Sequence, residues 1–279
     1  MSLSNFNPII KWSGSKRHQS EEILNHFPKE IDTYYEPFCG GASVLFALLN
    51  NPNIKVNNYV CSDNNQDLIN LWNYIKDEKE SLKEEYNYLW CELNSYESQE
   101  LKKYFYENIR NDFNANREPW KFFFLNRTCF NGLIRYNSKG EFNTSFHLNR
   151  NGIHPDKINN IIDEWSDLLN KSNVSFKCCS YQEIFPQEND FLYLDPPYAH
   201  TKGMYKETFD KDLFFSYLTN LKCKYALSYD GISGNDINTF PVPKHLFNTH
   251  ILIKSGNSSF KRIKESDKNA MVYESLYIK

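Results

Sequence analysis

A short apolar segment that ends in an acid, two prolines and an aromatic residue constrains the fold of this chain most. Residues 191–194 (FLYL) read as a buried strand, and Asp195, Pro196, Pro197 and Tyr198 follow at once. Two prolines end a strand and stiffen the backbone, because each fixes φ and lacks an N–H donor. In α/β sheets, ligands bind at the carboxyl ends of the strands. The segment therefore predicts an acid and an aromatic ring presented at such an edge.

A second strand exit lies near the N-terminus. Residues 33–38 read as a short strand, Gly40 and Gly41 follow, and a helix is expected over 42–50. Glycine lets the backbone pass close to a ligand. The next expected strand leads to Asp63, and an acid about 20 residues after such a turn commonly binds ribose hydroxyls. The turn lacks the GxGxxG and GKS/T patterns, so a dinucleotide or P-loop interpretation is weakened, and a purely structural turn stays an alternative.

The remaining pattern places strands early and late in the chain, with a helical block between them. An α/β fold fits best, with one sheet interrupted by a helical insertion. We expect the sheet domain to comprise residues 1–66 and 175–279, and the insertion to comprise 67–174. Further strands are expected at 56–61, 174–179, 225–228, 251–253 and 272–277, helices at 66–76, within 78–113, at 158–169 and at 212–221, and a hairpin or structured loop at 131–146.

Composition and charge exclude several classes of protein. An aromatic content of 16% argues against intrinsic disorder, and the longest apolar run is far short of the ~20 residues of a membrane span. The seven cysteines lack zinc-ligand spacing, so free thiols in a reducing cytoplasm are expected. The net charge is −3, yet residues 117–150 carry six bases against two acids. Such basic segments are either solvated faces or parts of one positive groove.

Four segments, taken together, resemble a known family. Residues 195–198 (DPPY) resemble the catalytic tetrapeptide of the amino-type DNA methyltransferases, in particular the Dam-like (D12 class, alpha-type) adenine-specific group. Residues 36–41 (EPFCGG) resemble the cofactor loop of that family, and residues 11–16 (KWSGSK) its N-terminal element. Residues 125–137 (LNRTCFNGLIRYN), with 140–143 (GEFN), resemble its DNA-contacting segment. The order of the segments is also that of the family, whereas the match is looser from Ala199 onward.

The resemblance implies a Rossmann-like sheet that uses S-adenosyl-L-methionine, with no metal. Residues 1–66 and 175–279 would form the catalytic domain, and 67–174 an inserted target-recognition domain containing a hairpin. The implied reaction is methyl transfer to N6 of an adenine flipped out of double-stranded DNA. A monomer in the cytoplasm is expected, encoded by a bacterium or a phage, with no membrane partner. A cognate restriction endonuclease, in a restriction-modification system, is a further partner that the family allows.

The chemistry of the tetrapeptide can be argued from the residues themselves. The N6 lone pair of adenine is delocalised into the ring, so this atom needs hydrogen-bond acceptors to become nucleophilic. Asp195 and the carbonyl of Pro196 can accept hydrogen bonds from its two N–H groups. Tyr198 offers a ring on which the purine can stack, at ~1–3 kcal/mol per base. The base must first leave the duplex, at a cost of about a few kcal/mol.

The resemblance also implies site residues. Arg135 could donate two hydrogen bonds to a guanine edge. Phe130 is the candidate wedge that fills the space left by a flipped base. Lys11, Leu133 and Arg135 match positions that read GATC in Dam-like enzymes, whereas Ser145 falls where those enzymes often have proline. The implied cofactor contacts are Trp12, Lys16, Phe38, Gly40, Asp63 and Asp195, and the implied DNA contacts are Lys11, Arg127, Phe130, Asn131, Leu133, Arg135 and Asn137.

Other functions fit the residues less well. A cytosine-C5 methyltransferase needs a Pro-Cys nucleophile, and this chain has no such pair. Cytosine-N4 enzymes usually have Ser in place of Asp195, so aspartate favours adenine without excluding N4 chemistry. Protein-glutamine methyltransferases usually have Asn there. A restriction nuclease would need a Glu-x-Lys after Asp156, and a non-catalytic DNA-binding module would not need the intact tetrapeptide and cofactor loop.

Overall fold

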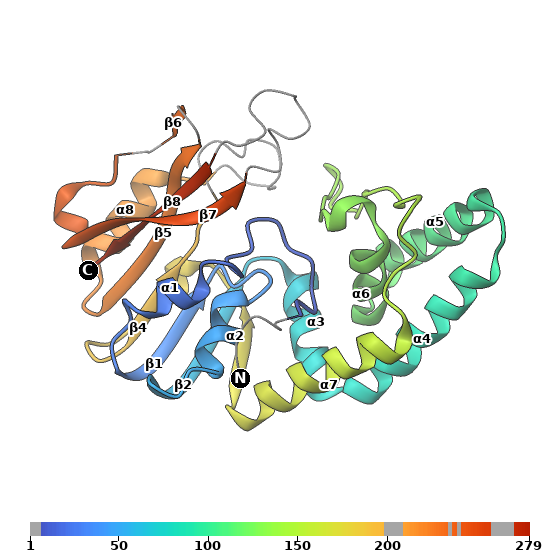
Figure 1. Ribbon diagram of the computed structural model, residues 1–279, viewed down its shortest axis with the longest axis horizontal. Coiled ribbons are helices and arrows are strands. Elements are labelled where there is room, and N and C mark those ends of the chain that lie inside the picture. Colours follow the sequence, from blue (N-terminus) through green and yellow to red (C-terminus); the bar gives the residue numbers. More distant parts are fainter. Residues whose placement is uncertain (1–6, 198–208, 234–235, 239–240, 258–270) are drawn as a thin grey trace. The chain divides into compact units, whose positions relative to one another are not determined.

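The computed structural model describes residues 7–197, 209–233, 236–238, 241–257 and 271–279. Within these residues the chain divides into two compact units. The first unit contains Lys16–Ser62 and Cys179–Lys279, and the second contains Asn5–Ser15 and Asp63–Cys178. The first unit is therefore built from both ends of the sequence, which appear in blue and in gold to red in Figure 1.

A mixed sheet forms the centre of the first unit. Its strand order is β2-β1-β4-β5-β8-β7, and the short β6 pairs with β5. The strands β2, β1, β4 and β5 run parallel, whereas β8 is antiparallel to both β5 and β7. All four residues of β4 are buried, as expected for a central parallel strand covered on both faces. The strands are β1 (Glu30–Pro37), β2 (Lys55–Asp63), β4 (Phe191–Leu194), β5 (Lys224–Ser233), β6 (Asp236–Asn238), β7 (Thr249–Asn257) and β8 (Met271–Ile278).

Helices cover this sheet through their apolar side chains. In α2 (Ser43–Leu49) every residue except the last is buried. In α8 (Lys211–Asn220) the buried Phe214 and Leu218 join a cluster with residues of β4 and β5. The unit also contains α1 (Ser20–Leu24) and two short 3-10 turns, η3 (Tyr181–Glu183) and η4 (Lys244–Leu246).

The second unit is helical, and α6 (Pro119–Thr128) lies at its centre. Every residue of α6 from Lys121 to Thr128 is buried, and α3, α4 and α5 pack against it. In α7 the buried Trp165 packs on Trp72 of α3, with ring centroids 5.0 Å apart. Trp72 in turn stacks on Phe176 of β3. The other elements are α3 (Gln66–Asp77), α4 (Lys79–Ser95), α5 (Gln99–Asn116), η2 (Phe130–Gly132), α7 (Pro155–Lys171) and β3 (Val174–Cys178).

Residues 129–146, which follow α6, form a bridged loop that we call the recognition loop. Two isolated antiparallel bridges, Cys129 with Phe146 and Tyr136 with Phe142, join its two sides. Side chains of α5 form hydrogen bonds with its backbone. The Tyr106 hydroxyl donates to the Thr144 carbonyl (2.9 Å), and Asn114 exchanges two hydrogen bonds with the backbone of Phe142. The expected hairpin thus takes the form of a loop with two bridges and no named strand.

The expected α/β architecture is confirmed, and each strand and helix predicted above has a counterpart in the structure. The elements that were not predicted are α6, α1, β6 and the 3-10 turns. Helix α6 is buried on nearly every side, so its apolar residues show no helical period, whereas the other elements are five residues or shorter. The patterns of apolar residues are too short there to indicate a period. No helix within the described ranges is both long enough and apolar enough to cross a membrane.

The pairing of β5 with β8 requires glycine at position 231, next to a bulge in β5. A Cβ at Gly231 would collide with the Tyr273 carbonyl oxygen and lie 2.9 Å from Cα of Glu274. Because backbone cannot yield as a flexible side chain can, we expect Gly231→Ala to lower stability by about 1–3 kcal/mol or more. Thermal melting followed by circular dichroism measures the change.

Gly14→Ala is the matched control, since a Cβ at Gly14 would have nothing within 4 Å. Its φ of +78° costs alanine about 1–2 kcal/mol, so a smaller loss is expected there. Equal melting temperatures for Gly231→Ala and the unsubstituted protein would contradict the predicted clash.

Candidate functional site

The carboxyl ends of three parallel strands lie at one edge of the sheet. In the register of β1 with β2, Pro37 is paired with Ser62, and in that of β1 with β4, Tyr35 is paired with Leu192. Both neighbours of β1 therefore end level with it. The glycine turn that follows β1 and the acid that follows β4 consequently emerge at the same edge, where α/β sheets bind ligands.

A buried lysine lies between two carboxylates at this edge. Nζ of Lys16 is 2.8 Å from Oδ2 of Asp195 and 3.4 Å from Oε2 of Glu274. The Lys16 side chain is only 4% exposed. Burial by itself lowers the pKa of Lys16, but the charges of Asp195 and Glu274 outweigh it and raise this pKa above its usual value. The Lys16 ammonium therefore stays charged and holds both carboxylates in place.

The backbone fixes the position of this lysine. The main-chain N–H of Lys16 donates to Oγ of Ser43 (3.1 Å), the first residue of α2. Since α2 follows the glycine turn directly, the turn and the lysine are coupled. Gly40 has a φ of 46° and Ala42 one of 50°, so the chain passes through left-handed backbone before the helix begins. The predicted cofactor residues Lys16 and Gly40 thus belong to one connected arrangement.

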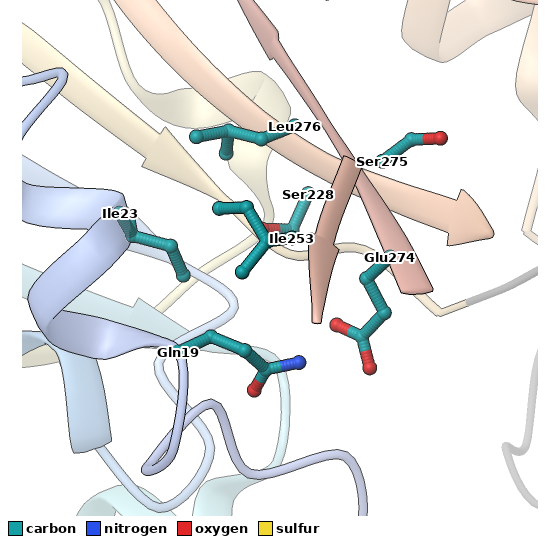
Figure 2. Close-up of a pocket in the computed structure, with 7 residues that line it drawn as sticks. All are labelled: Gln19, Ile23, Ser228, Ile253, Glu274, Ser275 and Leu276. Carbon is teal, nitrogen blue, oxygen red and sulfur yellow. The ribbon is translucent and has the colours of Figure 1, made fainter. Parts of the chain in front are cut away.

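Glu274 is a site residue that the sequence analysis missed. It lies on β8, and its Oε1 accepts a hydrogen bond from Oγ of Ser255 (2.9 Å). Figure 2 shows Glu274 at the rim of a small recess between α1 and the strands β5, β7 and β8. The recess is lined by Gln19, Ile23, Ser228, Ile253, Glu274, Ser275 and Leu276. Only the fold brings β8 to Lys16, and no motif in the loosely matched C-terminal part indicated this contact.

Glu36 is a second carboxyl group that was not predicted as a site residue. It is 4% exposed, and its Oε2 accepts a hydrogen bond from the Tyr34 hydroxyl (2.7 Å). Burial raises the pKa of Glu36 to about 8, although the hydrogen bond from Tyr34 acts in the opposite direction. The nearby charge of Asp195 raises the pKa of Glu36 further. Glu36 is therefore mostly protonated at neutral pH.

Phe38 is the aromatic residue of the glycine turn. It is partly exposed, and its ring centroid lies 5.5 Å from that of Tyr181 and 6.2 Å from that of Phe209. An aromatic wall of this kind suits a flat heterocycle.

Two further predicted catalytic residues follow Asp195. Pro196 is buried, whereas Tyr198 lies outside the described residues.

Two predicted cofactor residues belong to the second unit. Asp63 is the last residue of β2, and its Oδ1 accepts a hydrogen bond from the main-chain N–H of Asn65 (3.0 Å). Asn65 caps α3 by accepting from the N–H of Leu68. The Asp63 carboxylate is thus held at the turn from β2 into α3. Trp12 is partly buried in the N-terminal segment of this unit.

Lys11, a predicted DNA contact, is fixed in the second unit by α6. Its N–H donates to Oδ1 of Asn126, and its carbonyl accepts from Nδ2 of the same residue, both at 2.8 Å. Its side chain also packs on Gly132, where a Cβ would lie 2.5 Å from Cδ of Lys11. Burial, aided by the positive charges of Arg127 and Arg150, lowers the pKa of Lys11 to about 8.

Arg127 requires a correction. It was expected to contact DNA, but it is only 6% exposed. Its guanidinium donates to the carbonyls of Pro8 (3.2 Å) and Ile9 (3.3 Å). The basic residue therefore ties the N-terminal segment to α6, and its charge does not reach the surface. The basic segment 117–150 by itself does not indicate which of its charged side chains are buried.

The remaining predicted DNA contacts lie on the recognition loop. Phe130 is 48% exposed, Asn131 and Arg135 are exposed, and Leu133 is partly buried. Asn137 differs, because its side chain closes the turn of the loop: Oδ1 accepts from the N–H groups of Lys139 (2.9 Å) and Glu141 (3.0 Å). The surface of the loop thus presents an aromatic ring beside an exposed arginine.

Comparisons with known proteins agree with these features. The family model described as "D12 class N6 adenine-specific DNA methyltransferase" matches residues 12–271. The Type II methyltransferase M.MjaIII of Methanocaldococcus jannaschii is 35% identical over 205 residues, which are 68% of each chain. A DNA adenine methylase of Haemophilus influenzae is 33% identical over 199 residues, 69% of this chain and 64% of that relative.

The aligned part thus spans about two thirds of the length of these two relatives. The Type II methyltransferase M.CviBI of Paramecium bursaria Chlorella virus NC1A is 27% identical over 286 residues, with 89% of this chain and 99% of the relative covered. Because the family model spans nearly the whole sequence, this chain belongs to the D12 class of N6 adenine-specific DNA methyltransferases.

Proposed function

We propose that this protein transfers a methyl group from S-adenosyl-L-methionine to N6 of an adenine that has been flipped out of duplex DNA. The observation that carries the proposal is the position of Asp195, directly after the buried strand β4 and paired with the buried Lys16 at 2.8 Å. A carboxylate fixed in this way at the ligand-binding edge of the sheet can serve as a hydrogen-bond acceptor of defined direction.

The residues at this edge fit the expected methyl donor. Its methionine part carries an ammonium group, which the carboxylate of Asp195 can bind, and its adenine can lie against the ring of Phe38. Asp63, at the end of β2, is the proposed acceptor for the ribose hydroxyls. Trp12, Lys16 and Gly40 complete the proposed cofactor contacts. When bound, S-adenosyl-L-methionine supplies a methyl group on an already activated sulfonium.

Asp195 and the carbonyl of Pro196 are the proposed acceptors of two hydrogen bonds, one from each N–H of the N6 amino group. By accepting them, they draw the nitrogen toward tetrahedral geometry and localise its lone pair. Tyr198 is the proposed stacking partner of the purine. Glu36 supports this arrangement, because in its neutral form it adds no further negative charge beside Asp195. The charges of Asp195 and Glu274 then balance that of Lys16.

We assign DNA reading to the inserted segment 67–174 and catalysis to residues 1–66 and 175–279. Arg135, exposed on the recognition loop, is proposed to read a guanine, together with Lys11 and Leu133. GATC is the proposed target, because these residues match the GATC-reading positions of Dam-like enzymes. Phe130 is the proposed wedge, and Asn131 lies next to it with a φ of 56°.

The names of two relatives bear on the cellular setting. Two relatives carry the name Type II methyltransferase. These names support a role beside a cognate restriction endonuclease in a restriction-modification system. We further propose that the protein acts as a monomer in the cytoplasm, and that a bacterium or a phage encodes it.

Replacement of the catalytic acceptor tests the proposed function. Asp195→Ala should abolish methyl transfer while DNA binding survives, because the change removes an acceptor and no phosphate contact. Sequencing that detects N6-methyladenine, on DNA incubated with the protein and S-adenosyl-L-methionine, measures the loss and also reveals the target. Asp212→Ala, an exposed acid at the start of α8, is the control that should keep full activity. More than a few per cent of residual methylation would rule out the role of Asp195.

The protonation of Glu36 gives a prediction on stability. In the folded protein the pKa of Glu36 is about 8, above its usual value of 4.5 in an unfolded chain. The stabilisation by neutral Glu36 is therefore fully present below pH 4.5 and is lost as pH rises through 8. Glu36→Gln keeps an acceptor for Tyr34 and cannot ionise. Relative to the unsubstituted protein, the variant should gain stability between pH 5 and pH 9, on the order of a few kcal/mol.

Urea unfolding at pH 5, 7 and 9 measures this gap, which is the difference in free energy of unfolding between the variant and the unsubstituted protein. Glu188→Gln, at an exposed position outside the sheet, is the control for which the gap should stay flat. A gap for Glu36→Gln that does not change with pH would show that Glu36 is ionised throughout this range.

Arg135→Ala tests how the protein selects its site. If Arg135 reads a guanine, its loss should cost ~1–3 kcal/mol on the cognate site and much less on unrelated duplexes. The ratio of the two affinities, measured by fluorescence anisotropy, should therefore collapse. Lys139→Ala, an exposed lysine on the same loop, should weaken binding to both duplexes alike if it contacts only phosphate. A uniform loss for Arg135→Ala would move the search for specificity to Lys11 and Leu133.

A further inference from the structure

The exposed ring of Phe130 rests on the ring of His147, the residue that directly follows the recognition loop. Its centroid lies 5.5 Å from that of His147, and the two planes are inclined by 22°, which is a stacked arrangement. Phe130 is 48% exposed, whereas His147 is partly buried. One face of Phe130 is thus covered by the imidazole.

The backbone brings these two side chains together. Cys129 and Phe146 form an antiparallel bridge. Beside it, the N–H of Phe130 donates to the Ser145 carbonyl (2.8 Å), and the N–H of His147 donates to the Thr128 carbonyl (3.0 Å). Phe130 and His147 are therefore diagonal neighbours across the bridge, at a distance that aromatic side chains can span. Cys129 and Phe146 are buried, so the residues that follow them point to the opposite, outer face.

His147 is itself held in one orientation. Its Nδ1 accepts a hydrogen bond from the main-chain N–H of Asn149 (3.1 Å), and its carbonyl accepts one from the N–H of Arg150 (3.0 Å). The preceding Phe146 packs on Tyr106 of α5, with centroids 5.3 Å apart. The imidazole is thus fixed to the helical core of the unit through the bridge and the turn that follows it.

We propose that His147 is a positioning residue for base flipping, which holds the ring of Phe130 in the conformation that enters the DNA stack. The inference rests on the proposed function, in which Phe130 is the wedge. A ring on a free loop would lose rotamer freedom when it enters the duplex, whereas a ring already stacked on a fixed imidazole has lost most of it beforehand. His147 therefore acts on the flipping equilibrium through Phe130, without touching the reacting atoms.

Three substitutions separate stacking from the other contact of His147. His147→Ala removes both the ring and the acceptor. His147→Asn keeps an acceptor for the Asn149 N–H but has no ring, whereas His147→Phe keeps a ring and has no acceptor. The probe is a duplex that carries the methylated sequence found for the unsubstituted protein, with 2-aminopurine at the target adenine. Fluorescence reports flipping, and anisotropy reports binding separately.

The flipping equilibrium constant should fall by about threefold to tenfold in His147→Ala and His147→Asn, as expected for one lost aromatic pair. His147→Phe should retain most of it, and Leu148→Ala, a change at an exposed neighbour, should leave it unchanged. In a Phe130→Ala background, His147→Ala should have no further effect, because the two residues act as one unit.

The outcomes distinguish this inference from the function on which it rests. If Phe130→Ala reduces flipping and His147→Ala does not, the positioning role is overturned and the wedge stands. If His147→Asn retains flipping while His147→Phe loses it, His147 acts through the turn at Asn149, and the stacking role is overturned. If Phe130→Ala leaves flipping unchanged, the wedge and its support fail together, although methylation by the protein would still stand.

Discussion

The arrangement at the sheet edge depends on one buried charge, the ammonium of Lys16. A charged group inside a protein costs several kcal/mol unless partners compensate for it. Lys16 meets that requirement with Asp195 after β4 and Glu274 on β8, and its backbone is bonded to Ser43 at the start of α2. Three elements that are far apart in sequence must therefore reach the same point before the lysine can be buried. The acceptor Asp195 is oriented as a consequence of this condition.

Burial shifts the pKa values of acids and bases among the proposed functional residues in opposite directions. It disfavours the charged form of every group, so the pKa of Glu36 rises to about 8 and that of Lys11 falls to about 8. Lys16 is the exception, because two carboxylates lie within 3.4 Å of its ammonium. The first unit therefore holds a neutral acid, Glu36, and a charged base, Lys16, which both interact with Asp195. Such differences in protonation are typical of sites where hydrogen-bond acceptors must be controlled.

The recognition loop shows how an exposed surface is made rigid by its buried side. From residue 141 to residue 146, exposed and buried side chains alternate. The buried Phe142 and Phe146 pack on aromatic residues of the helices, and polar side chains of α5 satisfy carbonyls of the loop. A loop of this length would otherwise be costly to order. Phe130 and Arg135 are thus presented by a fixed backbone, which their proposed roles in reading DNA require.

The sequence by itself determined the order and type of the main elements, because apolar periodicity and turn residues are local signals. It also predicted the chemistry of the site from DPPY and EPFCGG, because the residues of each segment lie at the end of a single strand. Only the tertiary structure decided the contacts of Glu274, Arg127 and His147. The first approaches Lys16 across 258 positions of sequence, the second is buried against Pro8 and Ile9, and the third meets Phe130 through a bridge. Such contacts depend on which elements pack together, and no local pattern of residues encodes that choice.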